Sequence, residues 1–191
     1  SHSEIEKSRW DNALKAIIRY SFVGTIGDTV RYSDIGIMLL GEAVARLNNS
    51  ALDVAVTDRI CKPLGLSSVT YTPVMKGISL SKIIPTEIDS TWRGRRAWGE
   101  VHDENASGIG GIAGHAGLFA TAYDVATFGQ AWLSGNDKLN ISPDLRAQAT
   151  TQHAEGQFRM GLGWMLKANE GASAGDLFHE TTYGHTGFTG T

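Results

Sequence analysis

The chain of 191 residues contains a single cysteine, Cys61, so no disulfide can form within it. No apolar run approaches the roughly 20 residues that a membrane-spanning helix needs. The first residues lack the apolar segment of an export signal, so we expect such a signal to be absent or already removed. The chain also has no large excess of either charge, because 17 basic and 20 acidic residues give a net charge of only -3. Without a basic stripe, nucleic-acid binding is not expected.

Two signatures of serine hydrolases are absent or misplaced. No Gly-x-Ser-x-Gly segment occurs. One Ser-x-x-Lys segment runs from Ser79 to Lys82, but Pro85 follows too closely for the helical turn that would bring the lysine beside the serine. A single match is also expected by chance in a chain with many serines and lysines. Ser79 is therefore predicted not to be a nucleophile.

The composition that is present is that of a soluble globular domain, with 41% hydrophobic and 19% charged residues. Capping residues and apolar periodicity predict a helix from Ser8, with an apolar stripe through Trp10 to Ile18, that ends before Gly24. Further helices are expected over about 33–47, 52–60, 121–134 and 142–152. Strands are expected over about 161–166, 177–183 and 187–191. The intervening residues 67–118 predict a long ordered loop that walls a cleft.

Tyr32 precedes the helix that Ser33 or Asp34 is expected to cap. A phenol at a helix N-terminus lies where backbone dipoles favour negative charge. A nearby cation would lower its pKa further and let it act as a general base toward a serine. Taken alone, the sequence Tyr32-Ser33-Asp34 also fits an ordinary aromatic residue in front of a helix.

His185, Thr186 and Gly187 lie near the end of the chain, between glycines. An imidazole here supplies a cation that is weaker and more pH-dependent than lysine, because histidine titrates near pH 6.5. A glycine at 187 would let a substrate approach the backbone closely. A histidine that merely bonds a tyrosine hydroxyl remains an alternative.

The segment around residues 102–115 contains four potential metal ligands: His102, Asp103, Glu104 and His115. Their spacing does not match the short fixed spacings of zinc sites. A polar, hydrogen-bonded loop is the preferred interpretation, and neither a metal nor an organic cofactor is expected. The glycines between 108 and 117 are expected to permit close backbone packing.

Several segments together resemble the penicillin-binding-protein and class C β-lactamase superfamily of serine hydrolases, in its exported β-lactamase-like branch. They are Tyr-Ser-Asp-x-Gly-x-x-Leu-Leu-Gly from Tyr32, Pro-Leu-Gly-Leu at 63–66, Gly-Glu-Val-His-Asp-Glu-Asn-Ala at 99–106, and His-Thr-Gly from His185. Asp34 stands where the family usually has Asn, and His185 where it usually has Lys. The family's nucleophile comes from a Ser-x-x-Lys helix before the Tyr motif, and none precedes Tyr32 in this chain.

The resemblance implies an α+β fold, with a helical subdomain and part of an antiparallel sheet flanked by helices. On this interpretation residues 1–191 are an incomplete catalytic domain, divided into about 1–120 with the Tyr motif and about 121–191 with the His-Thr-Gly strand. The segments that complete the domain would then be its partners.

The resemblance also implies a reaction: acyl transfer from an amide, ester or β-lactam to a serine outside this chain. Tyr32 and His185 would be catalytic, and the N–H of Phe188 would be one oxyanion-hole donor. Asp34 together with Thr186 and Gly187 would contact the substrate.

Cell-wall peptides or related small amides are the implied substrates, and an extracytoplasmic location follows from them. A non-catalytic binding or scaffold module of the same fold is the alternative function. The catalytic interpretation requires the rings of Tyr32 and His185 to face one another.

Overall fold

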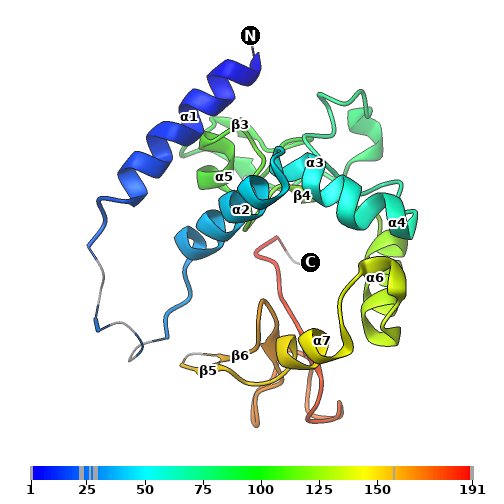
Figure 1. Cartoon of the computed structure of the whole chain (residues 1–191). Coiled ribbons are helices and arrows are strands. Elements are labelled where there is room, and N and C mark those ends of the chain that lie inside the picture. Colours follow the sequence, from blue (N-terminus) through cyan, green and yellow to red (C-terminus); the bar gives the residue numbers. More distant parts are fainter. Residues whose placement is uncertain (1, 22–23, 26, 28–29, 157, 190–191) are drawn as a thin grey trace. The chain divides into compact units, whose positions relative to one another are not determined.

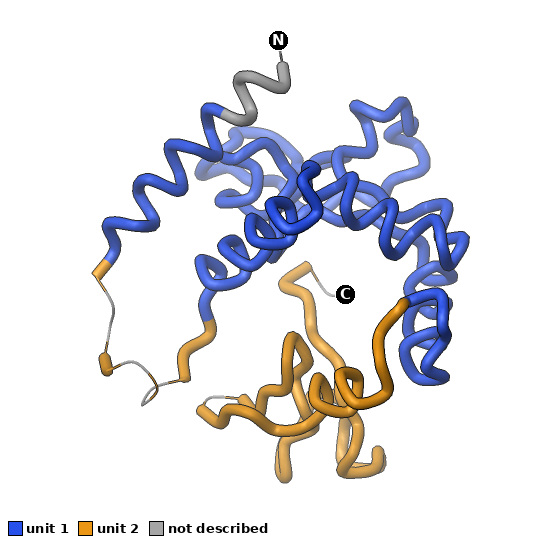
Figure 2. The backbone as a smooth tube through the Cα atoms, in the orientation of Figure 1, with its two compact units in different colours: residues 1–20, 33–139 blue, residues 21–32, 140–191 orange. Residues whose placement is uncertain are grey.

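The computed structural model describes residues 2–21, 24–25, 27, 30–156 and 158–189. They form two compact units (Figure 2). Unit 1 comprises Ser1–Tyr20 and Ser33–Leu139, and unit 2 comprises Ser21–Tyr32 and Asn140–Thr191. These bounds differ from the division at about residue 120 that the sequence suggested, and that subdivision of the domain stays a prediction. In the described part of the chain, no helix has the length and apolar character to cross a membrane.

Unit 1 is mainly helical (Figure 1). Its helices are α1 (His2–Ile17), α2 (Asp34–Asn48), α3 (Leu52–Val56), the π-helical η1 (Thr57–Cys61), α4 (Lys62–Leu64), η2 (Leu80–Lys82), α5 (Glu104–Gly108), α6 (Ala122–Ser134) and η3 (Asp137–Leu139). Its short strands form two antiparallel pairs: β1 (Thr70–Tyr71) with β4 (Leu118–Phe119), and β2 (Ile88–Asp89) with β3 (Arg95–Arg96). Residues 67–118 are thus largely irregular, as predicted.

Capping explains where α2 and α6 begin. Ser33 is the N-cap of α2, and its hydroxyl accepts the N–H of Gly36 at 3.2 Å. Thr121 caps α6 through the N–H of Asp124, and Gly135 ends this helix in the left-handed conformation with φ of 66°. The helix predicted over about 121–134 is therefore confirmed.

The predicted start of the first helix at Ser8 is wrong, because α1 begins at His2 and runs through Ser8 without a break. The preceding Glu and Lys residues favour helix, so the capping-box spacing at Ser8 does not mark an end. The apolar stripe is also shorter than predicted. Trp10, Leu14 and Ile17 are half-buried, whereas Ile18 follows the helix and is 73% exposed.

The loop around Gly114 packs its backbone directly on α2. A Cβ atom on Gly114 would lie 2.2 Å from the carbonyl oxygen of Ile37, and one on Gly41 would lie 2.9 Å from the Cα of Gly114. Only glycine permits this approach. The close backbone packing predicted for this glycine-rich segment is confirmed. Beside it lies the small core of Val101, Ala106 and Ala113.

Unit 2 contains a four-stranded antiparallel sheet of order β5-β6-β7-β8 and the helix α7 (Pro143–Ala149). The strands are β5 (Ala154–Glu155), β6 (Arg159–Met160), β7 (Met165–Leu166) and β8 (Tyr183–Gly184). The hydroxyl of Ser142 caps α7 by accepting the N–H of Leu145 at 3.2 Å, which confirms the predicted start. Mixed helix and antiparallel sheet is thus the fold class, as predicted.

The strands of unit 2 are shorter than their sequence predicts. Residues 187–189 are not in a strand, and the rest of the predicted strand, 190–191, lies outside the described residues. The predicted strand over 177–183 is reduced to its end, because Leu177 is fully exposed and forms no part of the ladder. Alternation of apolar residues did not distinguish a paired strand from an exposed loop here.

Candidate active site

Two candidate catalytic rings from distant parts of the chain meet in unit 2. The ring centroids of Tyr32 and His185 lie 6.2 Å apart with 41° between the ring planes. Phe158, from the β5–β6 turn region, meets Tyr32 edge to face at 6.3 Å. The structure therefore brings together the phenol and the imidazole as the sequence predicted. Their catalytic roles stay predictions.

Local packing explains how Tyr32 reaches this position. Tyr32 lies in an extended segment that precedes Ser33, and Val30 in the same segment passes over the glycine at 156. A Cβ on Gly156 would lie 2.9 Å from the carbonyl oxygen of Val30, so a larger residue there would push the segment away. His185 follows β8 directly, which fixes where its ring can lie.

The protonation pattern of the His185 ring follows from one contact. Its Nδ1 lies 2.8 Å from the carbonyl oxygen of Thr186. A carbonyl oxygen only accepts hydrogen bonds, so Nδ1 carries a hydrogen. In the neutral ring Nε2 is then a bare acceptor, and in the protonated ring it is a donor. The neutral ring can therefore accept a proton at Nε2. The sequence predicted His185 only as a cation in place of lysine and did not predict this capacity.

The other predicted residues of the motif follow His185 in irregular structure. Thr186 and Gly187 are exposed and Phe188 is 93% exposed, in a turn rather than a strand. The predicted strand at this motif is therefore wrong, since β8 ends at Gly184. The predicted oxyanion role of the Phe188 N–H, and the substrate contacts of Thr186 and Gly187, stay predictions.

Asp34 belongs to unit 1 and is the first residue of α2. Ser33, and not Asp34, caps the helix, so of the two capping candidates the structure selects the serine. The negative charge of the Asp34 carboxylate stabilises the helix, because it lies near the positive end of the helix dipole. One of its oxygens lies within 4.8 Å of ligand atoms of Asp103 and His115. Its predicted contact with substrate stays a prediction.

Three of the four residues weighed above as metal ligands, His102, Asp103 and His115, form side-chain hydrogen bonds. Asp103 caps α5 through the N–H of Ala106 at 2.7 Å, and the same oxygen lies 2.9 Å from Nε2 of His115. His102 turns elsewhere, with its Nε2 at 2.7 Å from Glu87. These contacts fit the preferred interpretation of a polar, hydrogen-bonded loop.

A buried ion pair in the same loop was missed from the sequence. Arg93 donates to Asp89 at 2.9 Å, and the two side chains are only 4% and 6% exposed. A second nitrogen of Arg93 donates to the carbonyl oxygens of Val101 and His102. Asp89 also accepts the backbone N–H of Trp92, and this bond above all lowers the pKa of its carboxyl. No motif signals this pair, because both residues lie in a loop without periodicity.

The geometry at Ser79 agrees with its rejection as a nucleophile. Its hydroxyl lies 2.9 Å from that of Ser81 and accepts the backbone N–H of the same residue, as the N-cap of η2. The backbone N–H of Lys82 donates to the carbonyl oxygen of Ser79 at 3.0 Å, but within the described residues the Lys82 ammonium makes no hydrogen bond to the Ser79 hydroxyl. The lysine therefore cannot activate this hydroxyl as a Ser-x-x-Lys pair requires.

The chain belongs to the Beta-lactamase family, whose model matches residues 3–191. This confirms the resemblance found in the sequence. A protein of Salmonella enteritidis PT4 named "Putative D-alanyl-D-alanine carboxypeptidase" is 36% identical, with 84% of this chain and 40% of the relative covered. A protein of the same name from Salmonella agona is 35% identical with the same coverage. The chain therefore spans about 40% of the length of the curated relatives it matches.

Solved structures share the fold at low sequence identity. The penicillin-binding protein homologue of Pyrococcus abyssi has a TM-score of 0.59 at 17% identity, over 75% of this chain and 31% of that one. Simvastatin synthase (LovD) from Aspergillus terreus has a TM-score of 0.62 at 15% identity, over 84% and 46%. The D-amino acid amidase of Ochrobactrum anthropi SV3 has a TM-score of 0.58 at 16% identity, over 81% and 43%. At these identities the likeness establishes the fold alone.

Proposed function

We propose that the protein is a serine hydrolase that works by acyl transfer on an amide, ester or β-lactam. The observation that carries this proposal is the meeting of the Tyr32 and His185 rings within unit 2. Membership of the Beta-lactamase family supports it. By resemblance, Tyr32 and His185 stand where the family's motifs have a tyrosine and a lysine. In this proposal the nucleophilic serine and its lysine lie outside residues 1–191, because the Ser79 segment is not built for that role.

The proposed chemistry assigns a proton path to the two rings. When the serine attacks the carbonyl, its hydroxyl proton passes to the oxygen of Tyr32, whose own proton His185 has accepted at Nε2. In the described structure no hydrogen bond joins Tyr32 to His185, and such contacts commonly tighten only with substrate bound. The N–H of Phe188 would stabilise the negative oxygen of the tetrahedral intermediate. Its collapse breaks the bond to the leaving amine or alkoxide, which takes the proton from the oxygen of Tyr32 and leaves the serine acylated. Water then attacks the acyl group and gives a proton to the oxygen of Tyr32, which passes it to the departing serine as the acid is released.

The proposed substrates are cell-wall peptides that end in D-alanyl-D-alanine, or related small amides. The name of the Salmonella relatives supports this choice, and the fold shared with a D-amino acid amidase is compatible with it. An extracytoplasmic location follows from such substrates and is part of the proposal. No metal or organic cofactor enters the proposed steps.

A non-catalytic binding module is the second candidate, favoured by one observation: no Ser-x-x-Lys precedes Tyr32 in this chain. The two candidates differ in whether a covalent acyl-enzyme forms. Incubation with a fluorescent penicillin, followed by intact-mass measurement, separates them. The experiment compares the 191-residue chain with the protein at its natural length.

The proposal predicts a penicillin adduct on the protein at its natural length and none on the 191-residue chain. Absence of any adduct on both, in samples that are folded by circular dichroism, contradicts the hydrolase and favours the binding module. An adduct mapped to Ser79 contradicts the assignment of the nucleophile. Release of D-alanine from a diacetylated Lys-D-Ala-D-Ala tripeptide then tests the substrate class separately.

A further inference from the structure

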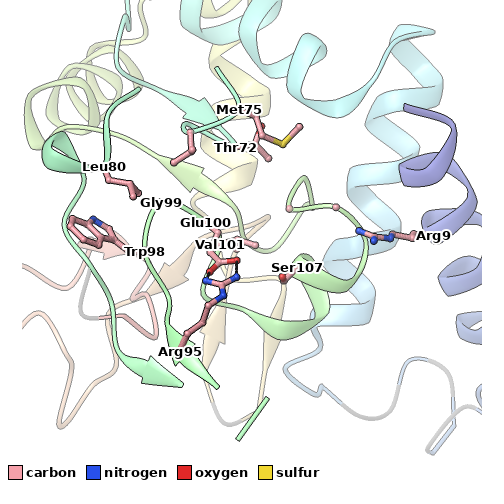
Figure 3. A pocket seen from close by; sticks show the side chains of 13 residues that line it. Arg9, Thr72, Met75, Leu80, Arg95, Trp98, Gly99, Glu100, Val101 and Ser107 are labelled. Carbon is pink, nitrogen blue, oxygen red and sulfur yellow. Dashed lines mark hydrogen bonds and ion pairs between the residues drawn. The ribbon is translucent and has the colours of Figure 1, made fainter. Parts of the chain in front are cut away.

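A cavity of about 370 Å³ lies within unit 1, and none of the residues that line it is assigned above to the reaction. Its size falls in the range of small-molecule sites, roughly 300–1,000 Å³. Figure 3 shows Arg9 on one side of the cavity, with Leu80 and Trp98 on the other. Arg9 comes from α1, and the remaining lining comes from loop segments between residues 72 and 111.

One wall of the cavity is apolar and held in place. Val74, Leu80, Trp98 and Val101 contribute to it. The indole N–H of Trp98 donates to the carbonyl oxygen of Ile83 at 2.7 Å, so the polar edge of the indole is already satisfied. What remains for a ligand is the apolar body of a fixed aromatic ring.

Backbone conformations that few residues tolerate shape the cavity. Gly99 has φ of 72°, and a Cβ there would lie 2.5 Å from both Leu80 Cδ2 and Val74 Cγ2. Thr72, a β-branched residue, has φ of 45°, a left-handed conformation that is strained for its type. Such strain persists where the surroundings over-determine it, and it is concentrated at ligand sites. Gly111 packs against the Thr72 methyl on the same side.

The charges that line the cavity do not cancel. The charge of Arg95 is neutralised by Glu100, because both terminal nitrogens of Arg95 donate hydrogen bonds to the Glu100 carboxylate. Arg9 forms no ion pair and no hydrogen bond with the described residues. The hydroxyls of Thr72 and Ser107 likewise have no partner in the described part of the chain. One uncompensated guanidinium and two available hydroxyls therefore line the same cavity as an aromatic wall.

We propose that this cavity binds a small organic monocarboxylate with an aromatic or branched apolar body. The planar guanidinium of Arg9 matches a carboxylate in geometry and charge. The Thr72 and Ser107 hydroxyls complete its hydrogen bonds, and the apolar body lies against Trp98 and Leu80. A single free cation suits one negative charge better than the two of a phosphate monoester. None of the proposed acyl-transfer residues lines this site, and the proposal does not depend on their function.

The test uses 3-phenylpropionate and its neutral isostere 3-phenylpropanamide as probes, with the protein at its natural length. Binding is followed by amide NMR shifts at Gly99, Gly110 and Gly111 and at the indole N–H of Trp98. We expect the acid to shift these signals with a dissociation constant of about millimolar or below, and to bind at least about tenfold more tightly than the amide.

Arg9→Gln should abolish the preference for the acid. Arg19→Gln is the matched control, because it removes the same charge from an exposed arginine that does not line the cavity. The control should keep the preference, and circular dichroism should show both variants folded. Equal binding of acid and amide, no shift at the cavity signals, or equal weakening by both variants would overturn the proposal.

Discussion

The rings of Tyr32 and His185 lie 6.2 Å apart between centroids, although the two residues stand near opposite ends of the chain. The short segment before α2 and the segment after β8 both belong to unit 2. Because Nδ1 of His185 is occupied by the carbonyl of Thr186, Nε2 is the nitrogen left for proton exchange. In the proposed mechanism the neutral imidazole accepts a proton, a role that a lysine charged at neutral pH would not share.

Replacing His185 by lysine tests that role through the pH dependence of turnover. Histidine changes charge between pH 5 and pH 8, and lysine does not. If a neutral imidazole is the acceptor, activity of the natural-length protein should rise as pH increases through this range, because an imidazole accepts a proton only in its neutral form. His185→Lys should flatten the profile between pH 5 and 8, whatever its absolute rate.

His153→Lys is the matched control, because the His153 ring bonds the carbonyl of Gln148 in unit 2 and has no assigned role. It should leave the slope of the pH profile unchanged. An activity that falls with rising pH in the unmodified protein, or a His185→Lys profile with the original slope, contradicts the proton-accepting role.

The buried pair of Arg93 and Asp89 should be required for stability. Arg93→Met leaves the Asp89 carboxylate without its buried partner, and removing one member of such a pair is strongly destabilising. We expect a clear fall in the midpoint of thermal unfolding. Lys62→Met breaks an exposed pair with Asp58 and should change stability by less than about 1 kcal/mol. Equal effects of the two substitutions would show that burial of the first pair is irrelevant.

The same carboxylate predicts how stability responds to acid. The backbone N–H of Trp92 and, to a lesser degree, the Arg93 guanidinium hold the pKa of Asp89 in the folded state below its ordinary value. A lowered pKa means that the stabilisation is complete above the unfolded value and is lost as pH falls toward the folded one. Urea midpoints should therefore fall more steeply below pH 4 in the parent than in Asp89→Asn. Parallel acid profiles for the two proteins would contradict this.

Two glycines in unit 1 should respond to alanine in opposite directions. Gly114→Ala places a Cβ 2.2 Å from the carbonyl oxygen of Ile37, so the loop must leave α2, at a cost of about 1–3 kcal/mol. Gly129 lies within α6 with nothing within 4 Å of an added Cβ, so Gly129→Ala should stabilise by about 0.5–1 kcal/mol. Urea unfolding of both variants measures the difference. A neutral Gly114→Ala would show that the close contact is not required.

Local signals in the sequence predicted the parts of the fold that local chemistry determines. Thr121, Gly135 and Ser142 act on their own helix ends, so their side chains and backbone suffice to predict the caps. The predicted helix start at Ser8 was wrong, because the spacing of a capping box alone cannot exclude a helix that has already begun. The strand over 187–191 was predicted from residue type, whereas a strand needs a partner, and pairing is a non-local property.

The candidate site likewise contains residues that the sequence predicted and features that depend on the folded structure. Tyr32 and His185 were found from motifs, and the structure adds their proximity and the proton on Nδ1. Arg93 and Asp89 are only four residues apart, but the contacts of Arg93 with the carbonyl oxygens of Val101 and His102 join two segments. The cavity beside Arg9 likewise depends on contacts between segments, which no sequence spacing encodes.

The most direct test of the central claim is the rate at which a fluorescent penicillin acylates the natural-length protein after Tyr32→Phe. Loss of the phenol oxygen removes the proposed proton carrier, so we predict acylation slower by about 10²–10⁴-fold. Tyr123→Phe, an exposed tyrosine in α6, should acylate at the parental rate. If Tyr32→Phe is acylated as fast as Tyr123→Phe, the phenol carries no proton in this reaction and the proposed mechanism is wrong.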